Sequence, residues 1–106
     1  MKMGYYTRHE LTVVKGSNYL IEKFRDISED ASYAITNTGD SDERCKWYRH
    51  QDELKNFSLL HPQALFKLSG EGEESGDIWH EYHQNGKMQL CKAQIVFADF
   101  DANLLR

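Results

Sequence analysis

Histidine, cysteine and carboxylate side chains give this sequence its main capacity for chemistry. His80 and His83 lie in one strand-like segment, and Cys91 follows beyond the turn signal Asn85-Gly86. Because strand side chains alternate between faces, the two histidines point to opposite faces and do not form a two-histidine metal site. The turn sets His80 opposite Cys91, which supplies two ligands where zinc needs three or four. The sequence therefore predicts no catalytic residue, metal or cofactor, and a thiol- or metal-dependent enzyme at this pair, joined by Cys45 if its strand is adjacent, stays as an alternative.

An acidic, glycine-bent loop directly precedes this segment, between Gly70 and Asp77. It lacks the Lys-Ser/Thr ending of a phosphate-binding loop and the Asp-x-Asp-x-Asp-Gly pattern of a calcium loop. A weak divalent-cation site and an ordinary solvated hairpin loop remain alternatives. We favour contact with a basic protein surface, since a simple hairpin does not need this much acid. The predicted contact residues lie in or just after the loop: Glu71, Glu73, Glu74, Asp77, Trp79 and Tyr82.

The elements that must position these residues follow from the spacing of apolar side chains. Alternation and β-propensity predict strands over residues 5–15, 32–36, 45–49, 64–69, 78–84 and 87–97. Helical spacing predicts two helices, whose buried stripes are Leu20, Phe24 and Ile27 in the first and Leu54, Phe57 and Leu60 in the second.

This order of elements indicates an α+β fold. The first six elements match the ferredoxin-like, split βαβ pattern, an antiparallel sheet with two helices on one face, to which a C-terminal β-hairpin is added. If Ser32 to Thr36 is helical instead, the fold becomes a simpler α+β sandwich. Residues 99–106 are expected to form a short cap or a frayed tail.

Composition predicts one domain spanning residues 1–106. The chain has 106 residues, of which 40% are hydrophobic, so it can close a core without disulfides or metals. Its formal net charge of -4 and its scattered Lys and Arg residues disfavour nucleic-acid binding. Two cysteines are too few for a disulfide framework, and neither a signal peptide nor a membrane span is recognisable. We expect a cytoplasmic protein that does not bind membranes.

Aromatic residues in the predicted strands offer a second candidate surface. With both helices on one face of the sheet, Tyr and Trp side chains on the open face can bind a partner. That arrangement is similar to an RNA-binding platform, although the RNA-binding signature is absent, and core packing is the competing interpretation for Trp47 and Trp79. A runner-up function is capture of a small molecule, such as a nucleotide, between the aromatic residues and Arg8, Lys46 or Arg49.

Several motifs resemble small proteins encoded by bacteriophages and prophages. The matching segments are Gly4-Tyr5-Tyr6-Thr7-Arg8, Cys45-Lys46-Trp47-Tyr48-Arg49-His50, the loop from Gly70 to Trp79, and Asn85-Gly86-Lys87. The resemblance covers most of the chain and brings no assigned activity with it. It implies a non-catalytic accessory protein in the host bacterial cytoplasm, which binds and redirects or blocks (inhibits) a host or host-defence macromolecule. An exposed sheet face or edge strand would also allow a homodimer.

Overall fold

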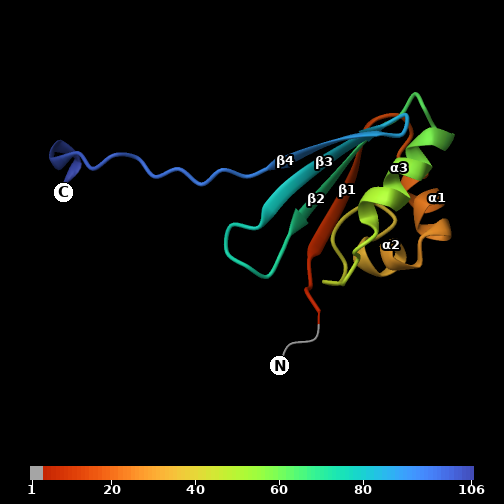
Figure 1. Ribbon diagram of the computed structural model, residues 1–106, viewed down its shortest axis with the longest axis horizontal. Coiled ribbons are helices and arrows are strands. Elements are labelled where there is room, and N and C mark those ends of the chain that lie inside the picture. The colour runs from red at the N-terminus through yellow and green to blue at the C-terminus, as the bar shows by residue number, and fades with distance from the viewer. Residues whose placement is uncertain (1–3) are drawn as a thin grey trace.

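The computed structural model describes residues 4–106 as a four-stranded antiparallel sheet with three helices on one face (Figure 1). The predicted α+β class is confirmed, whereas the part of the N-terminal prediction that falls on residues 1–3 lies outside the described residues. The strands lie in the order β1-β2-β3-β4, and each pairs with its neighbour antiparallel. The elements in chain order are β1 (Arg8–Lys15), α1 (Tyr19–Ile27), α2 (Glu29–Ala34), α3 (His50–Leu60), β2 (Leu65–Glu71), β3 (Ile78–Gln84), β4 (Lys87–Lys92) and a 3-10 helix (Ala102–Leu104). None of the helices in this described part combines the length and apolar character that crossing a bilayer requires.

Two predicted strands are absent from the described residues. Residues 32–36 belong mostly to α2, whose N-terminus is capped by Ser28 Oγ accepting a hydrogen bond from Ala31 N at 3.1 Å. Ala31 and Ala34 are fully buried, so packing of this small-residue face outweighs the β-propensity of the neighbouring residues. Residues 45–49 provide only a single bridge, between Cys45 and Thr7. The ferredoxin-like, split βαβ order is therefore not confirmed, because three helices follow β1 before the chain re-enters the sheet.

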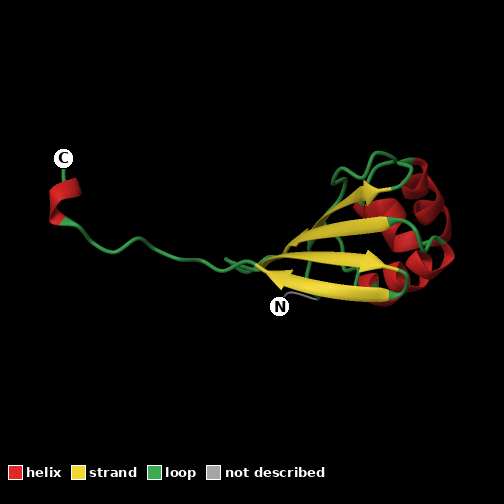
Figure 2. Ribbon diagram, turned by 90° about the horizontal axis from the view of Figure 1, so that it is seen from above, coloured by secondary structure: helices red, strands yellow, loops and turns green. Residues whose placement is uncertain are grey.

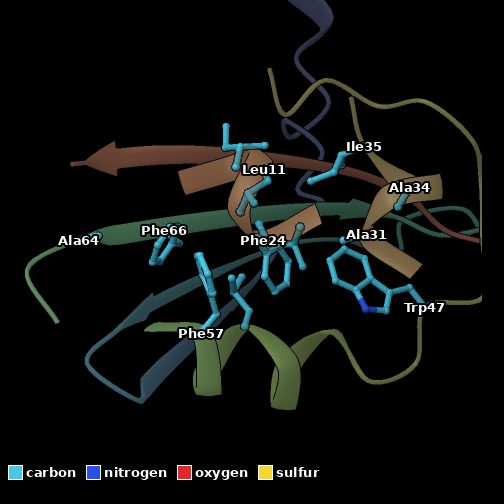
Figure 3. Packing of buried hydrophobic residues seen from close by; sticks show 12 residues of the cluster. Leu11, Phe24, Ala31, Ala34, Ile35, Trp47, Phe57, Ala64 and Phe66 are labelled. Carbon is cyan, nitrogen blue, oxygen red and sulfur yellow. The ribbon is translucent and has the colours of Figure 1, made fainter. Parts of the chain in front are cut away.

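The hydrophobic core fills the space between the sheet and the helices (Figure 3). The ring centroids of Phe24 and Phe57 lie 5.0 Å apart, and Phe57 lies 5.6 Å from Phe66 of β2. Trp47 is 2% exposed and packs against Phe24, so it belongs to the core. Both predicted helical stripes are only partly covered, since their last members, Ile27 and Leu60, are 64% and 70% exposed.

The Asn85-Gly86 turn and the strand register that it fixes are confirmed. Both residues have positive φ, +49° and +77°, as a type I′ turn requires. His80 pairs with Cys91 as predicted. In this register Glu81 is 1% exposed and faces the helices, whereas His80 belongs to the open face of the sheet.

Beyond β4 the chain leaves the sheet as an extended arm, residues 93–106, which contains the 3-10 helix close to its C-terminal end (Figures 1 and 2). The last ladder bond runs from Ala93 N to Ile78 O at 2.8 Å. The strand predicted to continue to Phe97 stops at Lys92 because β3 begins at Ile78, so the arm has no β3 residue left to pair with. Large apolar side chains of the arm are exposed, among them Phe97 at 87%.

Candidate functional site

The acidic loop between β2 and β3 is held in place by the N-terminal segment of the chain. Tyr5 OH donates a hydrogen bond to Asp77 Oδ2 at 2.6 Å and accepts one from Glu74 N at 3.0 Å. Tyr6 N donates to Glu73 Oε1 at 3.1 Å. The hydrogen bond to Asp77 raises the pKa of the Tyr5 phenol, which keeps this donor protonated. One tyrosine thus connects both ends of the loop to the start of the chain.

The loop borders an open hollow of about 630 Å³ whose lining includes Glu71, Glu73 and Glu74. Arg44 is the cation of this lining, and its Nη2 lies 3.7 Å from Glu71 Oε1 while its Nη1 donates to the Glu71 carbonyl at 3.5 Å. Ile78, 44% exposed, adds an apolar patch. The lining consists of Arg44, Glu71, Gly72, Glu73, Glu74, Ser75, Gly76 and Ile78. A hollow with carboxylates around an apolar patch suits a Lys or Arg side chain, which has an apolar stem and a cationic head.

The remaining two predicted contact residues, Trp79 and Tyr82, lie on opposite faces of β3. Trp79 packs against the hydrophobic core, and its ring stacks on His50 with centroids 4.9 Å apart. A Cβ at Gly70 would collide with the Trp79 indole, so the neighbouring strand leaves room for the ring only because it has glycine there. Tyr82 lies on the open face. The structure therefore brings the acidic residues of the predicted site together in one loop. Trp79 and Tyr82 do not form a common contact surface with them, because the two rings lie on opposite faces of the sheet.

A second group of ionisable residues, which the sequence analysis does not predict, lies between α3 and the sheet. Glu81 Oε1 is 3.0 Å from His50 Nδ1 and 3.1 Å from His83 Nε2, and its Oε2 accepts from Gln51 Nε2 at 3.0 Å. Because a carboxylate only accepts, both histidine nitrogens that contact it carry protons. His9 lies next to this group, with its ring centroid 5.9 Å from that of His50. We call His9, His50, Glu81 and His83 the carboxylate–histidine cluster.

Burial and hydrogen bonding set the charges of this cluster. Burial raises the pKa of Glu81, but hydrogen bonds from His50 and His83 outweigh this effect and lower the pKa to about 2. Burial lowers the pKa of His9 to about 4, and the charge of His50 acts in the same direction. His9 is therefore neutral and Glu81 ionised at neutral pH. Since the side chains of Glu81 and His83 are at most 1% exposed, the hydrogen bonds from His50 and Gln51 to Glu81 join α3 to the sheet from within the protein.

The sequence does indicate one property of this cluster, namely the face of the sheet on which its strand residues lie. Glu81 and His83 share the face of Trp79, and His9 shares the face of the buried Leu11. Alternation along β3 and β1 is enough to predict that these polar side chains point toward the helices. It does not indicate which helix residues they meet, because His50 lies far away in the sequence and α3 must be rotated correctly to present it.

The residues of the enzyme alternative are divided between the two faces of the sheet. His80 and Cys91 are paired on the open face, as the register predicts. Cys45 instead bridges to Thr7, which directly precedes β1, and its Sγ lies 4.0 Å from His9 Nδ1, so it does not join that pair. Burial raises the pKa of the Cys45 thiol, which disfavours the thiolate form. Within residues 4–106, no three or more His, Cys, Asp or Glu side chains are grouped so that they could hold a metal ion.

The cations of the small-molecule alternative are engaged separately. Arg8 Nη2 lies 3.3 Å from Glu10 Oε1 on the open face of the sheet, and Lys46 Nζ lies over the Tyr6 ring, 5.4 Å from its centroid. Arg49 is exposed and directly precedes α3. Trp47 lies in the core, so its ring is not available to a ligand at the surface.

Comparison with protein-family models, with curated proteins and with solved structures gives no match to this chain.

Proposed function

We propose that this protein is a non-catalytic binding protein, of the phage accessory type, that contacts a host or host-defence macromolecule through its acidic loop. The observation that supports this proposal best is the hollow formed by the loop, which gathers Glu71, Glu73 and Glu74 around exposed Ile78. Such a surface complements a protein partner that presents Lys or Arg side chains with apolar neighbours. It repels phosphate groups, which makes nucleic acid an unsuitable partner.

The anchoring of the loop supports tight binding rather than transient contact. Tyr5 holds Glu74 and Asp77 in one arrangement before any partner arrives. A loop that is already ordered loses less conformational freedom on association, so more of the contact energy appears as affinity. The net charge of -4 acts in the same direction, because it accelerates the encounter with a basic surface.

Inhibition is the effect that we propose for this contact. A basic surface on a host protein serves to bind acidic ligands of its own, and an acidic loop that occupies it excludes them. Binding alone is then sufficient for function, and no chemical step by the protein is needed.

Charge reversal in the loop provides the test of this proposal. We expect Glu73→Lys together with Glu74→Lys to weaken a partner captured from bacterial lysate by at least about tenfold, mostly through faster dissociation at physiological salt. Binding would be measured with the purified partner by surface plasmon resonance at two salt concentrations. Tyr5→Phe, which leaves the charge unchanged and removes the hydroxyl that anchors the loop, should weaken binding by a smaller factor.

The matched control is Glu22→Lys together with Asp26→Lys, which makes the same change in net charge on α1. This control should bind nearly as tightly as the wild type, and circular dichroism should show that all three variants are folded. If the loop variant binds as well as the wild type, or if lysates yield no partner, the proposal is wrong.

A further inference from the structure

The C-terminal arm carries more exposed apolar surface than an isolated domain normally leaves in water. Six large apolar side chains within residues 93–106 are between 64% and 87% exposed, namely Ile95, Val96, Phe97, Phe100, Leu104 and Leu105. Contiguous apolar surface of this kind marks an interaction site. The base of the arm is fixed, because Ile95 lies against the acidic loop at Gly76, so the residues beyond it are those available to a partner.

A groove that such an arm could fill lies between α1 and α3. It is a hollow of about 330 Å³ in which the apolar Phe24, Ile27, Phe57 and Leu60 lie beside the polar Ser28, Glu53 and Asn56. A second hollow of about 350 Å³ continues it past Leu60 toward Leu20. Ile27 and Leu60 belong to helical stripes whose other members are covered, yet they are 64% and 70% exposed. The helices therefore present an apolar groove that the chain's own core does not close.

The direction of the arm determines which groove it can enter. Figures 1 and 2 show that the arm leaves the sheet at the end remote from the helices and continues away from them. It thus extends away from the groove of its own chain and into solvent. The groove of a second copy has the same apolar lining and faces outward in the same way.

We infer that two copies of this chain exchange arms, so that Phe97 and Phe100 of each copy occupy the α1–α3 groove of the other. Reciprocal exchange makes a closed two-fold dimer and leaves neither arm exposed. A buried aromatic side chain removes on the order of 150 Å² or more from water, so the four rings of two arms contribute on the order of 600 Å². The aliphatic residues of both arms and both grooves add to this, which brings the total toward the 1,200–2,000 Å² that is roughly standard for a stable interface.

This inference is independent of the proposed function. Exchange uses the arm beyond Ile95 and the helix layer, whereas partner contact uses the acidic loop, which meets the arm at Ile95. A dimer of this kind would display two acidic loops and could engage a partner at two points.

The experiment uses two full-length variants with substitutions at exposed positions, so that folding is preserved. Phe97→Ser with Phe100→Ser removes the arm anchors, and Ile27→Glu with Leu60→Glu places charge in the groove. By sedimentation velocity we expect the wild type to be a dimer and each variant to be a monomer, with dimer dissociation constants raised at least about 100-fold. An equimolar mixture of the two variants should form a heterodimer, because one intact arm then meets one intact groove.

Three outcomes would overturn the inference: a wild type that stays monomeric across a wide range of concentrations, a groove variant that remains dimeric, or a mixture that gives no heterodimer. The second of these would indicate that arms pair with each other rather than with the groove. Val14→Glu with Tyr33→Glu, which places the same charges at other exposed apolar positions, is the control and should remain dimeric. Circular dichroism of each variant should match that of the wild type.

Discussion

Replacing Glu81 by alanine is expected to destabilise the fold by about 3–5 kcal/mol, because it removes a buried carboxylate that accepts hydrogen bonds from three side chains. The substitution leaves the protons of His50 and His83 and the Gln51 amide without their acceptor. These N–H donors then have no hydrogen-bond partner inside the protein, and their desolvation is no longer compensated. Urea denaturation followed by circular dichroism would measure the loss at pH 7.

Two further variants separate charge from packing. Glu81→Gln retains an oxygen acceptor of similar shape and removes the charge, so its cost should lie between those of the wild type and the alanine variant. Glu10→Ala breaks the exposed pair with Arg8 on the open face and should cost less than about 1 kcal/mol. A cost below about 1 kcal/mol for Glu81→Ala would show that the carboxylate–histidine cluster does not fasten α3 to the sheet.

Acidification is expected to lower the stability of the protein well before its exposed carboxylates are protonated. His9 has a pKa of about 4 in the fold and 6.5 outside it. Below pH 6.5 His9 therefore binds a proton in the unfolded chain but stays neutral in the folded chain. The free energy of unfolding falls until the pH reaches about 4. The difference between these two pKa values corresponds to about 3 kcal/mol, of which about 2 kcal/mol is lost between pH 7.5 and pH 5.

Glu81 adds a second, more acidic window in the same direction. Its pKa is about 2 in the fold and 4.5 outside it, so its contribution is complete above pH 4.5 and is lost as the pH falls toward 2. The measurement is the urea midpoint as a function of pH. His9→Phe, which keeps an aromatic ring beside Trp47 and Trp79, should flatten the curve between pH 6.5 and 4. If the urea midpoint of this variant depends on pH as steeply as that of the wild type, the pH dependence comes from a group other than His9. His80→Asn, on the open face, is the control and should leave the curve as steep as in the wild type.

Local signals predict much of the sheet and fail where tertiary packing decides. The Asn85-Gly86 turn fixes the β3–β4 register because it dictates positive φ at two positions. Residues 32–36 read as a strand since Tyr33, Ile35 and Thr36 have high β-propensity, but burial of the alanine face selects a helix. The arm beyond Lys92 contains residues of high β-propensity, but within residues 4–106 no strand lies beside it to pair with. The local sequence does not show that this partner is missing.

The candidate site shows the same division. The acidic residues between positions 71 and 77 are visible in the sequence, and the structure places three of them, Glu71, Glu73 and Glu74, around one hollow. The role of Tyr5 is not visible, because its contacts with Glu74 and Asp77 join opposite ends of the chain. The carboxylate–histidine cluster depends likewise on pairing residues from β1, α3 and β3, and only their inward direction follows from alternation.

The order of strands in the sheet also bears on how the chain is made. β1 ends at Lys15, but β2, its neighbour in the sheet that the described residues form, begins at Leu65, whereas β3 and β4 are joined by a two-residue turn. During synthesis β1 therefore leaves the ribosome first, and it has no strand to pair with until α1, α2 and α3 have also emerged. Closing so long a loop carries a larger entropic cost than closing the hairpin. The helices are therefore the first elements that can cover the apolar face of β1. The sheet is completed only when β2, β3 and β4 have been synthesised.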